Sequence, residues 1–528
     1  MQPKMMFAII ALIVIGIFVA QTFKPDKAEV KPLTISPASP RPVMMIVIDS
    51  LMDAPLQKAI KDGHTPAMKF LTQNGYYYPR VVSGFPTMSV SIDSTLLTGT
   101  LPNQHKIFGL SYFHPEQNRL VNFGTGLREA FAVGLKTVVK DGMQNLNQQF
   151  LSKDVQTIHE AVDRPTASVN AMIYRGKKKH ILKSPWLPVA AGVIPDQVET
   201  IGPDLFSFGT FSKIDPNSGH DQPWFRYGIN DTFARMEIVS LIKQNRLPLF
   251  TIAYFPKNDD VVHKKGASAT AGIRKADKEL QAILDAFPSW EEAIQHVTFI
   301  ILGDSGQADL VKDRQQAYID LRKVLNKYSI MPLKRKKPLP QDQIVLCVNE
   351  RMAYIYPMDE RLSIREMVDQ LRREHRLDII AWKENGSIQV VSGKRKGKLE
   401  FRPGGDKADP YEQSWKLNGD LSILDLTVRD EKRIQYGMYP DVLARLSGVM
   451  DTAKRVIVVT CEPGYEMVGE SSPTHKGASH GSLHQADSLV PMIVSGTESR
   501  PEHLRLIDFK NWILQLLSPD HKEVHTHH

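Results

Sequence analysis

Thr87 is the hydroxyl residue best placed in this sequence to act as a nucleophile. It lies in the stretch 84–91, Gly-Phe-Pro-Thr-Met-Ser-Val-Ser. Pro86 suits the approach to the first turn of a helix, and the apolar residues that follow recur at helical spacing up to Gly99. This pattern predicts a Thr87 hydroxyl at or near a helix N-terminus, where free backbone N–H groups favour an anion. Such a hydroxyl could carry out covalent phosphoryl or sulfuryl transfer, and the alternative is an ordinary N-cap threonine.

Acidic and histidine side chains elsewhere in the chain could supply a metal centre. Asp259 and His263 are four residues apart, a separation at which two side chains can converge on one ion. Asp49 and Asp304 each follow an apolar run, and the Gly-, Ser- and His-rich loop 469–484 comes late in the chain. We therefore expect ligands for one or two divalent ions, which would activate a threonine hydroxyl near neutral pH.

The elements that must position these side chains alternate along the chain. The run 43–48 is continuously apolar, which is typical of a strand buried on both faces of a parallel sheet. Asp49 then lies at the carboxyl end of a strand, where the ligands of such sheets gather. Alternating strands and helices predict an α/β fold with a doubly wound, mostly parallel sheet. Further strands are expected at 248–255, 297–303 and 455–461, and helices at 54–74, 230–244 and 267–287.

Changes in these patterns divide the chain into four parts. Between 340 and 440, short strand patterns surround one helical pattern, which indicates a small inserted α+β unit outside the main sheet. We predict an N-terminal segment 1–30, a linker 31–42, a catalytic α/β domain formed by 43–338 and 441–518, and an inserted subdomain 339–440.

The N-terminus resembles an export signal. Residues 5–23 are almost entirely apolar and follow Lys4, and their length suits a membrane-spanning helix better than the core of a signal peptide. We expect an uncleaved signal anchor, that is, an N-terminal transmembrane segment. The catalytic domain would then be extracytoplasmic, at a cell surface of the bacterial type. A cleaved signal peptide and secretion is the alternative.

The overall composition is that of a globular protein with a modest positive charge. Hydrophobic residues make up 42% of the chain and charged residues 23%, and the net charge is +8. This charge suits an anionic substrate or surface. No nucleic-acid-binding motif accompanies the basic residues, so we expect no nucleic-acid partner, and we make no prediction about oligomeric state. The two cysteines, Cys347 and Cys461, lie in apolar runs and are expected to be buried free thiols.

Five motifs, taken in chain order, resemble one group of enzymes. Together they are similar to the alkaline phosphatase superfamily, and specifically to its type I phosphodiesterase/nucleotide pyrophosphatase family. The motifs are Asp49, the helix start Phe85-Pro86-Thr87, Asp259-x-x-x-His263-x-x-Gly266, Asp304-x-Gly306 and Ser479-His480-Gly481.

This resemblance implies two bound divalent ions. One ion, for which we expect Zn²⁺, would be held by Asp259, His263 and His480. The other, Zn²⁺, Mn²⁺ or Mg²⁺, would be held by Asp49, Asp304 and the oxygen of Thr87. His475 and His484 compete for the late histidine position, but Gly481 follows His480 directly, as in the family pattern.

The resemblance also implies a reaction. Thr87 would form a covalent phospho-enzyme intermediate that water then hydrolyses. The substrate would be a small phosphate ester, with a nucleotide or a lipid or glycerol head group as possible forms.

Two departures from the family pattern concern the second ion and the substrate. Ser305 stands where the family has a histidine, so the second ion would lack an imidazole, and an all-oxygen site favours a harder ion such as Mg²⁺ or Mn²⁺. The nucleotide-cleaving members also carry an asparagine about two dozen residues after the nucleophile, where this chain has Phe108-Gly109-Leu110. Nucleotide cleavage therefore follows less directly from the sequence than the fold does.

Several other functions stay open at this point. A phosphodiesterase is the leading hypothesis. A phosphomonoesterase, a phosphonate hydrolase or a head-group phosphotransferase could use the same fold. A sulfatase is disfavoured, because the residues around Thr87 do not form the Cys/Ser-x-Pro-x-Arg sequence of that class. A catalytically weak surface-binding protein is the alternative of a different kind, and Ser305 is the feature that favours it.

Overall fold

The computed structural model describes residues 40–450 and 455–518. The predicted anchor, 1–30, and most of the predicted linker, 31–42, lie outside these residues. Within the described ranges, no helix combines the length and the apolar character needed to span a membrane.

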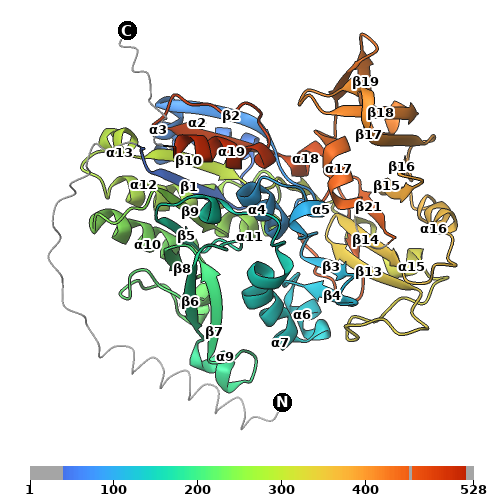
Figure 1. Cartoon of the computed structure of the whole chain (residues 1–528), viewed down its shortest axis with the longest axis horizontal. Coiled ribbons are helices and arrows are strands. Elements are labelled where there is room, and N and C mark those ends of the chain that lie inside the picture. Colours follow the sequence, from blue (N-terminus) through green and yellow to red (C-terminus); the bar gives the residue numbers. More distant parts are fainter. Residues whose placement is uncertain (1–39, 451–454, 519–528) are drawn as a thin grey trace.

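A seven-stranded sheet forms the first half of the molecule (Figure 1). Its central strand is fully buried and pairs in parallel with a neighbour on each side. The parallel pairing continues outward through β5 and β8, whereas β24 is antiparallel to both of its neighbours. The predicted α/β fold with a mostly parallel sheet is therefore confirmed. The order is β2 (Gly75–Val82), β24 (Leu489–Ser495), β10 (Thr298–Gly303), β1 (Val43–Ile48), β9 (Phe250–Phe255), β5 (Thr166–Val169) and β8 (Leu205–Ser207).

Helices cover both faces of this sheet. Alternate residues of β1 enter different cores: Met44 and Ile46 pack with one set of helices, and Met45 and Val47 with the other. This three-layer packing explains why the strand is apolar at every position. The first set is α2 (Asp53–Lys61), α3 (Pro66–Gln73), α10 (Asp231–Lys243), α12 (Ala271–Leu284) and α13 (Trp290–His296); the second includes α4 (Ser89–Thr98), α17 (Val442–Met450) and α19 (Leu506–Leu516).

A second, nine-stranded sheet forms the other half of the molecule (right in Figure 1). Its strands pair antiparallel, apart from one parallel bridge between β17 and β20. The order is β13 (Ile344–Asn349), β14 (Met352–Pro357), β21 (Ile457–Cys461), β15 (Leu377–Glu384), β16 (Ser387–Val391), β17 (Leu399–Ala408), β20 (Arg433–Tyr436) and β19 (Leu426–Arg429), with β18 (Ser414–Gly419) beside β17.

The prediction that 455–461 is a strand of the main sheet was wrong. The strand exists as β21, but it lies between β14 and β15 of the second sheet. Its unbroken apolar sequence fits the centre of either sheet, because both faces of β21 are buried. The second sheet therefore extends past the expected boundary at 440. Cys347 and Cys461 are buried free thiols, as predicted.

Shorter elements connect and flank the two sheets. They are α5 (Pro102–His105), β3 (Ser111–His114), β4 (Arg119–Asn122), α6 (Leu127–Val133), α7 (Leu135–Lys140), η1 (Asp141–Phe150), α8 (Ile158–Ala161), β6 (Lys178–Lys183), α9 (Trp186–Ala190), β7 (Gln197–Gly202), η2 (Pro223–Gly228), α11 (Lys257–Lys265), β11 (Ala308–Asp309), α14 (Arg314–Ala317), β12 (Tyr318–Asp320), α15 (Leu321–Val324), α16 (Ile364–Leu371), η3 (Leu421–Leu424), β22 (Glu466–Val468), β23 (Ala478–Ser479) and α18 (Gln485–Ser488).

Candidate active site

The predicted acidic residues meet at one edge of the first sheet. Asp49 follows β1, and Asp304 follows β10. Asp259 lies on α11, which follows β9. Since β1, β9 and β10 are parallel neighbours, their carboxyl ends lie side by side, as expected for a ligand site in this class of sheet. Ser50 links the three positions: its N–H donates to Asp304 at 2.9 Å and its hydroxyl donates to Asp259 at 2.9 Å.

The first predicted set of metal ligands comes together in the structure. Asp259, His263 and His480 present ligand atoms within 4.8 Å of one another. Nε2 of His263 lies 3.2 Å from Oδ1 of Asp259, and Nε2 of His480 lies 3.8 Å from the same oxygen. We call this set the histidine half of the site.

Both imidazoles of the histidine half are oriented through their other nitrogen. Nδ1 of His263 donates to the Ala478 carbonyl oxygen at 2.8 Å, and Nδ1 of His480 donates to the carbonyl oxygen of Thr87. Each Nε2 is therefore left to face Asp259. Backbone carbonyls commonly fix metal-binding histidines in this way.

The other late histidines lie in different surroundings. His475 stacks on His263 with ring centroids 3.9 Å apart, and its Nδ1 lies 2.8 Å from Glu466. His484 caps α18 and accepts a hydrogen bond from the Ala486 N–H. The geometry therefore favours His480 for the late position, with His475 beside the site.

Glu350 also faces the histidine half, although no sequence motif pointed to this residue. Its Oε1 lies 3.8 Å from Nε2 of His263, and its Oε2 lies 3.9 Å from Nε2 of His480. Glu350 follows β13 in the second sheet and belongs to none of the five motifs. It also has a φ of 56°, a left-handed conformation that costs a non-glycine residue about 1–2 kcal/mol.

The charges of the histidine half favour a cation. Burial alone would lower the pKa of His263, but the carboxylates of Asp259 and Glu350 raise it to about 10. Burial would likewise raise the pKa of Glu350, but the nearby histidines lower it to about 2. The carboxylates therefore stay ionised and hold positive charge between them.

Carboxylates alone form the other part of the site, which we call the carboxylate half. Asp49 and Asp304 are buried, and burial is the main cause that raises the pKa of both groups. Asp304 accepts hydrogen bonds from Ser50 N–H and from the Tyr254 hydroxyl, the latter at 3.2 Å. Oδ1 of Asp49 is buried and has no hydrogen-bond partner within the described residues. A buried carboxylate oxygen without a partner fits a site built to take a cation.

Asp93 is a second acidic residue that the sequence did not single out. It lies on α4 and is fully buried, and within the described residues neither carboxylate oxygen has a hydrogen bond of normal geometry, although the Met172 backbone acts on it and lowers its pKa. Its pKa is raised by burial and by the charge of Asp304, and its own charge contributes to the raised pKa of Asp49. Asp93 therefore adds a carboxylate to the half in which Ser305 replaces a histidine.

The N-terminus of α4 brings a hydroxyl to the carboxylate half, but the hydroxyl belongs to Ser89. Helix α4 begins at Ser89, two residues after Thr87, and ends at Gly99 in the left-handed conformation, as expected. Ser89 is partly exposed, and a hydrogen bond from its side chain lowers the pKa of Asp304. Thr87 is fully buried; its hydroxyl accepts from Gly481 N–H at 2.8 Å and lies 3.3 Å from the Ser482 carbonyl oxygen, to which it donates.

The sequence of the chain matches a known family of enzymes. A sequence model described as type I phosphodiesterase / nucleotide pyrophosphatase matches residues 43–483, which is most of the chain. The chain belongs to this family. The type I phosphodiesterases and nucleotide pyrophosphatases are hydrolases that act on phosphoric ester bonds. No sequence among the curated proteins matches the chain.

Solved structures of ectonucleotide pyrophosphatase / phosphodiesterase 5 share the fold of this family member. The murine protein, in an inactive variant with one threonine replaced by alanine and in complex with AMP, is 14% identical, with a TM-score of 0.54. The match covers 90% of this chain and 95% of that one. The human protein is 12% identical, with a TM-score of 0.51 and the same coverage.

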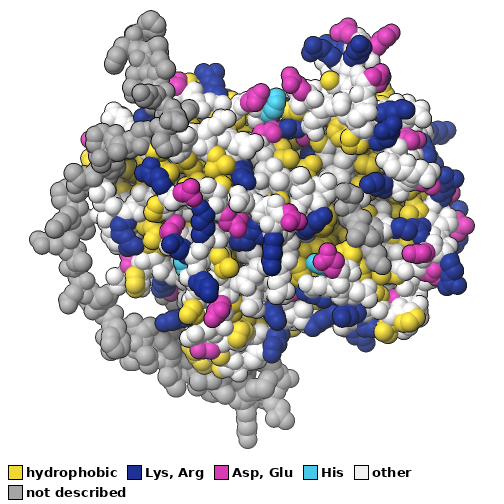
Figure 2. Space-filling model, in the orientation of Figure 1, with side chains coloured by type: hydrophobic (Ala, Val, Ile, Leu, Met, Phe, Trp, Pro, Cys, Tyr) yellow, Lys and Arg dark blue, Asp and Glu magenta, His cyan; other side chains and the backbone are white. Residues whose placement is uncertain are grey.

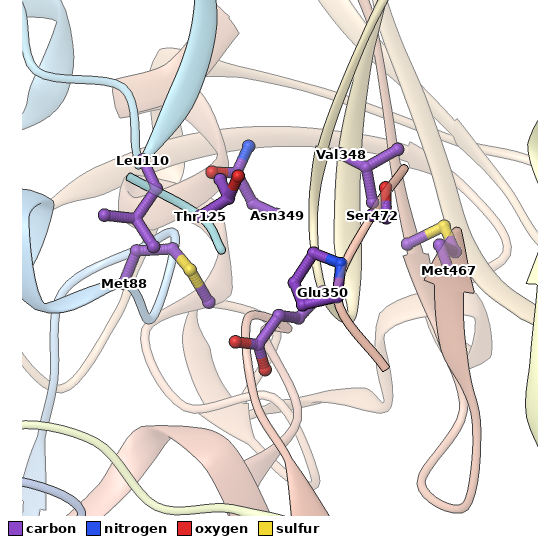
Figure 3. Close-up of a pocket in the computed structure, with 9 residues that line it drawn as sticks. Met88, Leu110, Thr125, Val348, Asn349, Glu350, Met467 and Ser472 are labelled. Carbon is purple, nitrogen blue, oxygen red and sulfur yellow. The ribbon is translucent and has the colours of Figure 1, made fainter. Parts of the chain in front are cut away.

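Two cavities adjoin the site of this phosphodiesterase family member. A small one is lined by Leu110, Asn349 and Glu350 among others, and Figure 3 shows Glu350 between Met88 and Leu110 on one side and Val348 and Met467 on the other. The Asn349 amide bonds both backbone groups of Ser111 and is not free for a ligand. A larger open cleft of about 650 Å³ has Lys58, Arg80 and Gln307 in its lining.

The larger cleft reaches the histidine half through Gln307, whose amide donates to Asp259 at 2.6 Å. Its lining also contains Asp53 and Asp309, so the charges of Lys58 and Arg80 are balanced there. Elsewhere on the molecule, Lys and Arg side chains are interspersed with Asp and Glu over the face shown in Figure 2.

Proposed function

We propose that this chain is a metal-dependent phosphoesterase that uses the Ser89 hydroxyl as nucleophile and forms a covalent phospho-enzyme. The observation that carries the proposal is the position of Ser89: it is the first residue of α4, it is partly exposed, and it bonds Asp304 at the end of β10. A nucleophile must be reachable by substrate, and the fully buried Thr87 is not.

Thr87 is then a positioning residue. Its carbonyl oxygen orients His480, and its hydroxyl holds the backbone of Gly481 and Ser482. Both contacts hold the loop that carries His480 against the start of α4. The histidine half and the carboxylate half therefore keep their positions relative to each other. Thr87 as nucleophile remains the alternative, as the sequence predicted.

The reaction would proceed in two steps. In the first, the oxygen of Ser89 attacks phosphorus and its proton passes to the Asp304 carboxylate; the bond to the leaving oxygen breaks, and that oxygen leaves with the electron pair. In the second, water attacks phosphorus and the bond to the Ser89 oxygen breaks; that oxygen takes back the proton held by Asp304, and the protons of the water leave with the phosphate product or pass to solvent. The unpaired N–H groups of the first turn of α4 would bind the phosphoryl oxygens. Bound divalent ions would supply Lewis-acid stabilisation of the oxygens that gain charge.

The candidate ligands support a different ion preference in each half. We propose Zn²⁺ with Asp259, His263 and His480, where imidazoles are present. We propose Mg²⁺ or Mn²⁺, or a more weakly held Zn²⁺, with Asp49 and Asp304, because Ser305 supplies no imidazole.

For the substrate we propose a small phosphate ester. The AMP bound to the related murine structure supports a nucleotide. Leu110, beside Glu350, offers no hydrogen bond to a phosphoryl oxygen, and an ester with a lipid or glycerol head group is the alternative substrate.

The test is phosphoester hydrolysis by the full-length protein in detergent. Chromogenic diester and monoester substrates would be followed after chelation and after Zn²⁺, Mn²⁺ or Mg²⁺ is restored. Loss of a nucleophile should lower kcat by about 10³–10⁶-fold in S89A. T87V, which loses the Thr87 hydroxyl but keeps its carbonyl oxygen, should retain much more activity.

Trapping of the phospho-enzyme provides a second readout. Brief reaction with labelled substrate and acid quenching should leave phosphate on the wild-type protein and on T87V, but not on S89A. Phosphate on S89A and none on T87V would return the nucleophile to Thr87. Absence of turnover with every ion and both substrates would favour the surface-binding alternative.

A further inference from the structure

We propose that Glu350 is a fourth protein ligand of the ion bound in the histidine half, giving that ion two imidazoles and two carboxylates. This inference rests on the proposed metal dependence. It adds to the three ligands that the family motifs imply, Asp259, His263 and His480, and draws its new member from the second sheet.

The distances fit four ligands around one ion. With bonds of about 2.0–2.1 Å, the ligand atoms of a tetrahedral zinc site lie about 3.3–3.4 Å apart. Nε2 of His263 lies 3.2 Å from Asp259 and 3.8 Å from Glu350. Nε2 of His480 lies 3.8 Å from Oδ1 of Asp259 and 3.9 Å from Oε2 of Glu350, which is the other oxygen of that carboxylate. Glu350 forms a group within 4.8 Å with His263 and His475, so its Oε1 must turn towards His480 to complete the set with Asp259.

The Glu350 carboxylate is held in place by one of its two oxygens. Oε2 accepts from the Ser479 hydroxyl at 2.8 Å and from His480 N–H at 3.3 Å. This arrangement leaves Oε1 directed at Nε2 of His263. A carboxylate that is oriented by outer partners and presents its other oxygen to imidazoles has the usual form of a monodentate ligand.

The backbone at Glu350 is an independent sign of function. Glu350 and Arg351 form the two-residue turn between β13 and β14, and Glu350 has φ 56°. Glycine is the residue that two-residue hairpins favour at such a position. The turn is fixed by Arg351, which is fully buried, forms an ion pair with Asp487 and donates to the Cys461 carbonyl oxygen at 3.1 Å. Strained backbone of this kind persists mostly where a side chain has a specific task.

Coordination by Glu350 has a chemical consequence. Two carboxylates balance the charge of a divalent ion, whereas Asp259 alone leaves one positive charge. The four-ligand site should hold its ion more tightly, and a substrate oxygen would enter as a fifth ligand.

The experiment measures metal affinity in the full-length protein. Wild type and E350Q, both freed of metal by chelation, would be titrated with Zn²⁺ against a competing chelator. Even outer partners of a zinc site are worth roughly 10–100-fold in affinity, so the loss of a charged ligand should weaken binding by at least about 10-fold. Co²⁺ absorption would report the ligand set directly, and its band position should shift in E350Q.

H475Q tests the other set that Glu350 could join, because His263, Glu350 and His475 also present ligand atoms within 4.8 Å of one another, although Nδ1 of His475 is held by Glu466 at 2.8 Å. It should keep the affinity within about 3-fold, below the cost of an outer partner. E350G supplies a second variant that keeps the left-handed turn with a residue suited to it, and it should lose affinity as E350Q does.

Unchanged zinc affinity and an unchanged Co²⁺ spectrum in both Glu350 variants would overturn the proposal. An equal loss in H475Q would overturn it as well, since the ion would then lie on the His475 side. These readouts need no substrate: tight zinc binding that depends on Glu350 in a protein without turnover would reject the proposed function and keep this inference.

Discussion

The two halves of the candidate site are built on opposite principles. In the histidine half, acidic and imidazole groups lie next to one another. The pKa of Glu350 is therefore lowered, and the pKa of His263 is raised. In the carboxylate half, burial raises the pKa of Asp49, Asp93 and Asp304, and the charge of neighbouring carboxylates raises that of Asp49 and Asp93 further. One half is electrostatically satisfied without an ion, whereas the other is not.

The two halves therefore differ in how far their structure depends on a bound ion. The histidine half can hold its geometry through its own ion pairs and through the bonds of the imidazoles to backbone carbonyls. Among the described residues, the carboxylate half has buried oxygens without hydrogen-bond partners, so an ion there would relieve an unfavourable interaction.

Loss of an imidazole from the histidine half should have the largest effect. H263Q removes one of the two imidazoles that face Asp259, so zinc affinity should fall by at least about 100-fold, beyond the cost of losing an outer partner. D304N, in the other half, should leave this ion bound. Zinc retained per chain after dialysis against graded chelator would measure both. Equal release from the two variants would show that the halves bind as one unit.

An imidazole added to the carboxylate half should make the halves more alike. S305H restores the ligand type that Ser305 replaces, so zinc should bind there more tightly by on the order of 10-fold. S305A is the control, since it changes the same buried position without adding a ligand. Two-site zinc titration would resolve the effect, and thermal unfolding would show whether the larger side chain fits. Equal zinc titrations for S305H and S305A would contradict this assignment.

The smallest expected effect concerns the stability of the metal-free protein. The raised pKa of Asp93 means that its ionised form destabilises the fold, so the penalty is present near neutral pH and disappears as pH falls toward 4. D93N should therefore raise the free energy of unfolding of chelated protein by about 1–3 kcal/mol at pH 7. The gain should shrink toward pH 4.

The opposite pH dependence is expected in the histidine half. The lowered pKa of Glu350, about 2, stabilises the fold above pH 4.5, and this stabilisation is lost as pH falls toward 2.

Denaturant unfolding of D93N and wild type from pH 4 to 8 with chelator measures the effect of the Asp93 charge on stability. A D93N protein that is less stable than wild type at pH 7 under these conditions would show that Asp93 has a stabilising partner.

Much of the first sheet, and the site residues that follow its strands, could be predicted from local sequence. Continuous apolar runs located β1, β9 and β10, and a polar residue after each run located the site edge. The four-residue spacing on α11 brought Asp259 and His263 together, as expected. These features depend on residues that are near one another in the chain. The spacing of apolar and polar residues is therefore enough to predict them.

The remaining features depend on contacts between distant segments or on small shifts. Glu350 reaches His263 only because the second sheet packs beside the first, and no spacing rule links them. The apolar run of β21 fits either sheet, so periodicity could not assign it. Helix α4 begins two residues after Thr87, and this small difference in a helix boundary is why we propose Ser89 as the nucleophile while Thr87 stays a prediction.

The buried ion pair of Arg351 and Asp487 ties the turn of the second sheet to the loop before β24 of the first. Arg351 lies in the turn that carries Glu350, and Asp487 follows the loop that carries His480. The chain enters the second sheet, leaves it through β21, and returns to the first sheet as β24 only after passing this pair. A shorter hydrolase could therefore not be obtained by excising 339–440, because that cut would remove a wall of the active site together with the anchor of its remaining loop.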